Sequence, residues 1–160
     1  MRLFLDANAV LKRYIAEPGS DAVTRVFMAA DAGRATLQYS LWTLGECLGV
    51  FDRLERQGRF PRGGMVRGQR ALFGETARLA RLGVLSVAPL RAGLMRRAWD
   101  LLLTYHLYQA DALQIASAVD TRSDLVLTSD AHVARGAAGE GLRVLDPETD
   151  ALQIDQALRE

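Results

Sequence analysis

Short apolar runs alternate along the chain with longer segments whose apolar residues recur at helical spacing. The runs predict buried strands at 2–5, 35–39, 85–88, 125–128 and 142–145. The longer segments predict helices at 7–15, 20–30, 41–56, 66–82, 91–103, 110–121, 131–135 and 150–159. Strands that alternate with helices indicate a parallel sheet covered by helices on both faces. The pattern therefore predicts an α/β protein with three layers, α/β/α, around a central parallel sheet of four to five strands.

Two of the predicted helices differ in how much of their surface is apolar. Segment 110–121 is apolar almost all round, which predicts a helix buried in the middle of the domain. Segment 41–56 has a single apolar stripe, which is expected to face the core and consists of Leu41, Leu44, Leu48, Phe51 and Leu54. Glu46 lies off this stripe, so its carboxylate is not part of the predicted core.

Glycines mark two further places in the sequence. Gly45 and Gly49 lie inside the predicted helix 41–56, on the same face as Glu46. Glycine in a helix costs stability relative to alanine, so we expect another element to approach closely there. Gly136, Gly139 and Gly141 follow the short helical turn at 131–135 and predict a flexible connection to the last strand.

The composition is that of an ordinary globular chain, with 160 residues, of which 49% are hydrophobic and 24% charged. This length predicts one domain, residues 1–160, with a sizeable core. No apolar run approaches the roughly 18 residues of a membrane span, and the N-terminus lacks the pattern of a signal peptide. We therefore expect a cytoplasmic protein without membrane contact. The single cysteine, Cys47, excludes an internal disulfide, and His106 and His132 lack the spacing of zinc ligands.

Charge is distributed unevenly, although the net charge is only +1. The segment from Arg53 to Arg97 holds eleven arginines and two acids, Glu55 and Glu75, which is a balance of +9. The other residues comprise nine basic and seventeen acidic ones, a balance of −8. One part of the chain thus suits an anionic partner and another suits cations. The alternative, that these arginines are solvated faces of helices, stays open because the sequence does not show whether they share a surface.

Four acids stand close to the predicted carboxyl ends of strands. Asp6 ends the first strand, and Asp130 follows the fourth. Asp111 lies at the start of the buried helix, and Glu46 lies one to two turns into the helix that follows the second strand. Ligands of an open parallel sheet bind at the carboxyl ends of its strands, so the four side chains can meet at one edge. Each acid taken alone is also explained as a helix cap or a solvated residue.

Converging carboxylates repel one another, and a hard divalent cation such as Mg²⁺ or Mn²⁺ relieves that repulsion because it takes oxygen ligands. One or two such ions activate water and stabilise the charge that develops on a phosphodiester. The four acids therefore point to metal-dependent phosphoryl chemistry that needs no histidine base.

The acids are carried by four stretches: LFLDANA at 3–9, with EPGS at 17–20, SLWTLGE at 40–46, YQADALQIA at 108–116 and LVLTSD at 125–130. Together these stretches resemble the motifs of PIN-domain proteins, and among them the VapC-type ribonuclease toxins. The resemblance covers nearly the whole chain and implies a PIN-like fold. One position departs from it, because a hydroxyl residue often follows the first Asp and here the residue is Ala7. We expect Asn8 to supply a polar side chain instead.

The resemblance implies a metal-dependent RNA endonuclease, the toxin of a toxin–antitoxin pair, with Ser129 as a polar helper at the site. It implies that Mg²⁺ or Mn²⁺ is bound by Asp6, Glu46, Asp111 and Asp130. It also implies a homodimer and a small antitoxin protein whose C-terminal segment covers the acidic pocket. Five arginines are candidates for binding the RNA backbone or the antitoxin: Arg56, Arg59, Arg62, Arg67 and Arg70.

Other classes of protein fit the sequence less well. A phosphatase or phosphorelay receiver needs a lysine near the site, and the lone lysine, Lys12, follows the first strand rather than a later one. The segment after the first strand has no glycine-rich loop, which excludes a dinucleotide-binding site and a P-loop. Two alternatives stay open: a PIN nuclease that serves RNA processing, and a nucleic-acid or protein-binding module without catalysis.

Overall fold

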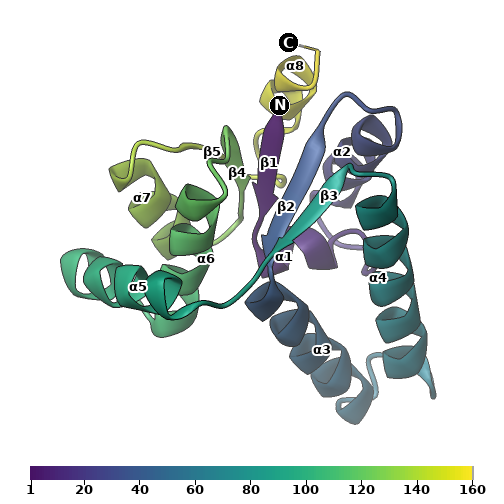
Figure 1. Cartoon of the computed structure of the whole chain (residues 1–160). Helices are drawn as coiled ribbons and strands as arrows, with labels where there is room; N and C mark the ends of the chain where they lie inside the picture. The colour runs from purple at the N-terminus through teal and green to yellow at the C-terminus, as the bar shows by residue number, and fades with distance from the viewer. Residues whose placement is uncertain (160) are drawn as a thin grey trace.

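The computed structural model describes residues 1–159 and contains one five-stranded sheet (Figure 1). All four strand pairs are parallel, and the strand order is β3-β2-β1-β4-β5. The strands are β1 (Arg2–Leu5), β2 (Thr36–Ser40), β3 (Leu85–Ala88), β4 (Leu125–Leu127) and β5 (Arg143–Leu145). The predicted three-layer α/β/α fold with a parallel sheet is confirmed.

Helices cover both faces of this sheet (Figure 1). They are α1 (Ala7–Leu11), α2 (Ser20–Asp31), α3 (Leu41–Arg56), α4 (Gly64–Arg81), α5 (Ala92–Tyr105), α6 (Gln109–Asp120), α7 (Ala131–Gly139) and α8 (Ala151–Ala157). Side chains of α1 to α4 and α8 pack on one face, and those of α5, α6 and α7 pack on the other. In the part of the chain that the structure describes, no helix combines the length and the apolar character that crossing a membrane requires.

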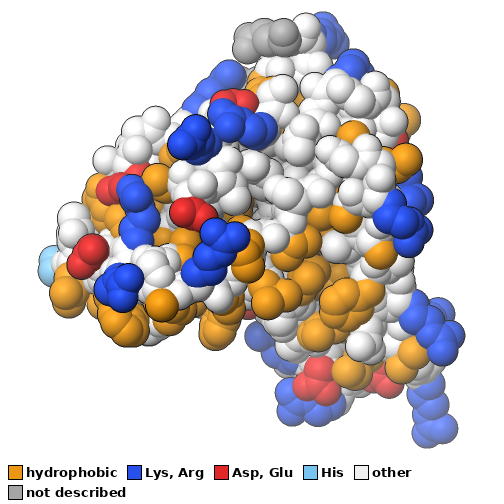
Figure 2. All heavy atoms as spheres, viewed as in Figure 1, with side chains coloured by type: hydrophobic (Ala, Val, Ile, Leu, Met, Phe, Trp, Pro, Cys, Tyr) orange, Lys and Arg blue, Asp and Glu red, His pale blue; other side chains and the backbone are white. Residues whose placement is uncertain are grey.

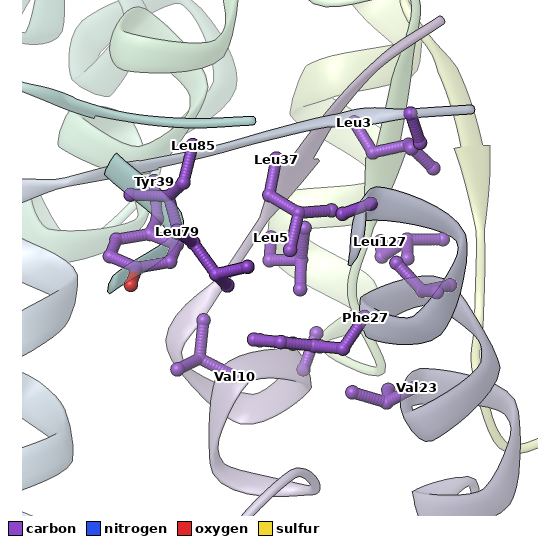
Figure 3. Close-up of a cluster of buried hydrophobic side chains, with 14 of the residues drawn as sticks. Leu3, Leu5, Val10, Val23, Phe27, Leu37, Tyr39, Leu79, Leu85 and Leu127 are labelled. Atoms are coloured by element: carbon purple, nitrogen blue, oxygen red, sulfur yellow. The ribbon is translucent and has the colours of Figure 1, made fainter. Parts of the chain in front are cut away.

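Alternation along β1 divides the core into two clusters, because successive residues of a strand point to opposite faces. Leu3 and Leu5 join the cluster under α1, α2 and α4, whereas Phe4 joins the cluster under α5 to α7. Figure 3 shows the first cluster, in which Leu37 of β2 and Phe27 of α2 lie beside Leu5. A slip of β1 by one residue would exchange the two faces. Burial on both sides therefore fixes where β1 ends.

The α3–α4 hairpin carries most of the arginine-rich segment and projects from the end of β2 (Figure 1). α4 has no side-chain cap of its own, and Glu55 of α3 replaces it by accepting a hydrogen bond from the Met65 N–H at 2.6 Å. Glu75 accepts two hydrogen bonds from the Arg13 guanidinium, at 3.1 and 2.9 Å, which tie α4 to the segment after α1. The two acids of the arginine-rich segment thus have structural roles, because Glu55 caps α4 and Glu75 ties α4 to Arg13.

Both predictions about helical glycines are wrong. Gly136 and Gly139 do not form a flexible connection but belong to α7. A Cβ at Gly136 would lie 2.6 Å from Ile115 Cδ1, so glycine lets α7 approach α6 closely. Gly45 and Gly49 are exposed on α3, and a Cβ at either would meet nothing within 4 Å. No other element approaches α3 at these two positions.

The predicted apolar stripe of α3 is only partly correct. Leu44, Phe51 and Leu54 are buried, whereas Leu48 is only partly buried and Leu41 is 52% exposed. Leu41 and Leu90 line an open cleft of about 300 Å³ beside Glu46. Helical spacing placed Leu41 on the core side, whereas in the structure its side chain lies at the surface in this cleft, although Thr43 and Leu44 of the same turn are buried.

Gly136→Ala is expected to lower the free energy of unfolding by about 1–3 kcal/mol. Overpacking against Ile115 costs about that much and outweighs the roughly 0.5–1 kcal/mol that alanine gains in a helix. Gly49→Ala is the matched control and should raise stability by up to about 1 kcal/mol, since its Cβ meets open space. Urea denaturation of the two variants measures the difference, and equal stabilisation by both would contradict the close packing of α7 on α6.

Candidate metal-binding site

Asp6 is the first residue after β1 and is only 5% exposed. Its Oδ1 accepts a hydrogen bond from the Ala7 N–H at 2.6 Å, which caps α1. Its Oδ2 accepts hydrogen bonds from Asn8 Nδ2 at 2.7 Å and from Thr128 Oγ1 at 2.8 Å. Both carboxylate oxygens are therefore held by neutral donors.

The electrostatic environment of Asp6 disfavours its ionised form. Burial raises the pKa of Asp6 to about 7, since a charge loses hydration there. The hydrogen bonds from Thr128 and Ala7 act in the opposite direction, and the negative charges of Glu46 and Asp130 raise the pKa further. In the absence of a cation, Asp6 thus titrates near neutral pH.

Asn8 links the ends of two strands. Besides Asp6, its Nδ2 contacts Thr128 Oγ1 at 3.1 Å, and its Oδ1 accepts the Ser129 N–H at 2.9 Å. Asp6 and Asn8 follow β1, whereas Thr128 and Ser129 follow β4. The expected polar side chain beside Asp6 is therefore present, and it fixes the two strand ends against each other.

Asp130 and Ser129 lie at the end of β4. Asp130 is the N-cap of α7, and its Oδ1 accepts the His132 N–H at 2.7 Å and the Val133 N–H at 3.2 Å. The Ser129 hydroxyl donates to Asp146 Oδ1 at 2.6 Å, and its side chain thus pairs with an acid that the sequence did not single out. Asp130, Ser129 and Asp146 line one cavity of about 350 Å³.

Asp111 lies in the first turn of α6 and is partly buried. Burial raises the pKa of Asp111, and the negative charge of Asp130 raises it further. The positive charge that His132 carries when protonated acts in the opposite direction. The start of α6 therefore lies within electrostatic reach of the start of α7, where Asp130 and His132 are located.

Glu46 lies on α3 and is partly buried. Its Oε2 accepts a hydrogen bond from Gln114 Nε2 at 2.5 Å. Burial raises the pKa of Glu46, the hydrogen bonds from Gln114 and Trp42 lower it, and the charge of Asp111 raises it. Gln114 and Asp111 are three residues apart on α6, so a single helix supplies one acid and the partner of another.

The four predicted acids interact electrostatically as one group. The charges of Glu46 and Asp130 raise the pKa of Asp6. The charge of Asp130 also raises the pKa of Asp111, and the charge of Asp111 raises that of Glu46. Within residues 1–159, none of the four forms a salt bridge. Their carboxylate oxygens are the donor type that Mg²⁺ and Mn²⁺ bind. Over the same residues, however, no three His, Cys, Asp or Glu side chains are already gathered as a metal cage. The carboxylate oxygens are suitable ligands for such an ion, but the four side chains would have to move closer to one another to bind it.

The five predicted arginines lie at the other end of α3 from Glu46. All five are exposed, and they follow the last turn of α3, the connection and the first turns of α4. Arg56 is ten residues beyond Glu46, which is about 15 Å along a helix axis. Figure 2 shows basic side chains gathered along α4 and at the end of the α3–α4 hairpin, and all of them are arginines because the only lysine of the chain is the buried Lys12. The structure thus separates the arginines from the acids.

Sequence reasoning missed three polar residues that contact the predicted ones: Gln114, Thr128 and Asp146. Gln114 interrupts an otherwise apolar helix surface, and Thr128 directly precedes the motif residues Ser129 and Asp130. Both residues could have been selected from the sequence, because a polar side chain inside a buried apolar segment needs a hydrogen-bond partner. Asp146 follows β5 as Asp6 follows β1, but a short final strand gave little reason to select it.

Comparisons with known proteins agree with this architecture. The family model described as PIN domain matches residues 3–139. A protein of Pyrobaculum aerophilum, PAE2754, superposes with a TM-score of 0.65 at 14% identity, over 98% of this chain and 96% of that chain. VapBC2 of Rickettsia felis, bound to a DNA fragment from its promoter, superposes with a TM-score of 0.58 at 14% identity, over 91% of this chain and 98% of that chain.

VapC20 of Mycobacterium tuberculosis, a toxin that cleaves the sarcin–ricin loop, gives a TM-score of 0.58 at 18% identity, over 86% of this chain and 94% of that chain. No curated protein matches the sequence. At these identities, the likeness to solved structures establishes the fold alone, whereas the family model covers most of the sequence itself. By its fold and by that match, the chain belongs to the PIN domain family.

Proposed function

We propose that this chain is a metal-dependent endoribonuclease that uses Mg²⁺ or Mn²⁺. The observation that carries the proposal is the group of four electrostatically interacting carboxylates at the carboxyl edge of the sheet. Neutral side chains donate hydrogen bonds to Asp6 and Glu46, and within residues 1–159 none of the four acids forms a salt bridge. PIN-domain proteins are nucleases, and membership of that family supports phosphodiester hydrolysis as the reaction.

Asp6 and Asp111 bind the cation directly in this proposal, and Asp130 and Glu46 complete the set of ligands. When bound, the ion supplies an activated water and offsets the charge that develops on the phosphodiester. Asn8 and Thr128 hold the Asp6 carboxylate in one orientation through Oδ2. Burial keeps bulk water from screening Asp6, so its attraction to a cation is stronger than at the surface.

We further infer that the protein is a toxin of the VapC type, one PIN domain over residues 1–160, which acts on RNA in the cytoplasm as a homodimer. The structural likeness to the VapC20 toxin and to the VapBC2 complex supports this reading. A small antitoxin protein is then its partner and covers the acidic site. The exposed arginines of the α3–α4 hairpin bind the RNA backbone or this antitoxin through guanidinium contacts.

Purified protein should cleave single-stranded RNA with Mg²⁺ or Mn²⁺ and lose this activity with EDTA. Asp111→Asn should lower the rate by more than the roughly 10–100-fold that loss of an outer-shell partner costs, because it removes a direct ligand. Asp120→Asn, an exposed acid on the same helix, is the control and should cleave normally. Cleavage that persists in EDTA would sink the proposal.

Asp6→Asn should change the pH dependence of stability in metal-free buffer. The pKa of Asp6 is raised from 3.8 to about 7, so its contribution is fully favourable below about pH 4 and is lost as the pH rises to 7. Between pH 4.5 and 8 the wild type should therefore lose on the order of 3 kcal/mol of stability relative to the variant. Urea denaturation at several pH values measures this shift. Saturating Mg²⁺ should cancel it by stabilising only the wild type, whereas parallel pH curves would contradict it.

Arg59→Gln combined with Arg62→Gln should weaken RNA binding and reduce its salt dependence. Each lost phosphate contact on a single strand lowers the slope of log K against log salt by about 0.7. Arg34→Gln with Arg81→Gln removes the same charge from exposed positions outside the hairpin end and is the control. Unchanged RNA binding in the first pair would assign these arginines to the antitoxin, which a binding titration with that protein then tests.

A further inference from the structure

Gln114 is a buried amide in an apolar helix. It is only 2% exposed, and its neighbours Leu113, Ile115 and Ala116 are fully buried aliphatic residues. An amide at such a position costs stability unless its donors and acceptor are paired. A residue that served packing alone would be leucine or methionine, so the polar contacts of Gln114 need an explanation.

The two ends of the amide contact different parts of the candidate site. Gln114 Oε1 accepts hydrogen bonds from Thr43 Oγ1 at 2.9 Å and from Ser40 Oγ at 3.2 Å. Gln114 Nε2 donates to Glu46 Oε2 at 2.5 Å. Ser40 and Thr43 form the N-terminal cap of α3, the helix that carries Glu46. The amide thus connects the fixed start of α3 to the carboxylate in its second turn.

The orientation of the amide follows from its surroundings. Ser40 Oγ accepts the Thr43 N–H, and Thr43 Oγ1 accepts the Ser40 N–H. The two hydroxyl oxygens also lie 3.0 Å apart, so one hydroxyl can donate to the other while the second still donates its proton to Gln114 Oε1. The reversed amide would direct its carbonyl oxygen at the Glu46 carboxylate, and two acceptors repel. The NH₂ group therefore faces Glu46, and the cap of α3 holds it there.

We propose that Gln114 is a positioning residue that fixes the Glu46 carboxylate for metal binding and so sets the affinity of the acidic site. The proposal rests on the proposed function, in which Glu46 is one of the ligands. Partners that orient a ligand from outside the coordination sphere typically change metal affinity by about 10–100-fold when removed. A neutral donor suits this task, because it orients the carboxylate without neutralising it.

Gln38 supplies a matched control. It is likewise a buried glutamine, 6% exposed, and both ends of its amide are paired, with Thr121 O at 3.1 Å and Ser123 Oγ at 2.7 Å. Those partners lie after α6 and before β4, at the opposite end of the sheet from the acids. Methionine fills the space of glutamine and has no amide. Gln38→Met therefore reports the structural cost of losing a buried amide.

The experiment measures Mn²⁺ binding to the wild type, Gln114→Met and Gln38→Met by titration calorimetry without RNA. Gln114→Met should weaken Mn²⁺ binding by about 10–100-fold, and its RNA cleavage should need correspondingly more Mn²⁺ for half-maximal rate. Gln38→Met should lower stability but keep the wild-type affinity for Mn²⁺. Equal affinity in all three folded proteins would overturn the proposal, and so would equal loss in both variants.

Crystal structures of metal-free wild type and Gln114→Met give a second readout that does not depend on activity. We expect one conformer of Glu46 in the wild type and more than one in the variant, and an unchanged single conformer in the variant would refute the positioning role. A wild type that binds no Mn²⁺ and cleaves no RNA would defeat the proposed function, whereas the Glu46 conformers would still decide the role of Gln114.

Discussion

Parallel pairing of β1 with β2 on one side and β4 on the other is the constraint on which the rest of the structure depends. It brings the carboxyl ends of strands that are distant in sequence to one edge. The residues that follow the ends of β1 and β4 then meet, since Asn8 and Thr128 contact each other and both donate to Asp6. Because Leu5 and Leu127 are buried against helices, the strands cannot slip without exposing apolar surface. The core thus fixes the place of each polar residue at the edge.

The acidic edge is stabilised by neutral hydrogen-bond donors and not by positive charges. Asn8 and Thr128 donate to Asp6, and Gln114 donates to Glu46. A lysine or arginine there would compensate the charge permanently and would occupy the place of a cation. Neutral donors orient the carboxylates and leave their charge in place, which is why burial still raises the pKa of Asp6 to about 7. In the proposed function, a divalent cation offsets the negative charge that these neutral donors leave in place.

The arginine-rich hairpin complements this edge. The two acids of its arginine-rich segment are engaged in structural contacts, with Glu55 capping α4 and Glu75 paired with Arg13. The exposed arginines at its end are therefore largely left to solvent or to a partner, although Arg56 pairs with Asp52 one turn earlier at 2.9 Å. Such exposed pairs contribute little to stability. The same chain thus has acidic residues at the edge of the sheet and exposed arginines at the end of the α3–α4 hairpin. A polyanion bound to these arginines would lie within the length of one helix of the acids.

Local pattern determined a large part of this protein. Apolar runs and helical periodicity predicted the strands, most of the helices and the position of the four acids, because these features depend on residues close in sequence.

Contacts between elements distant in sequence decided the features that the local sequence pattern does not predict. Gly136 lets α7 pack closely against Ile115, the side chain of Leu41 lies at the surface, and Gly45 and Gly49 face open space. The partners of the acids were likewise decided in space: the Glu46 carboxylate is oriented by an amide 68 residues away in sequence, and no periodicity encodes that distance.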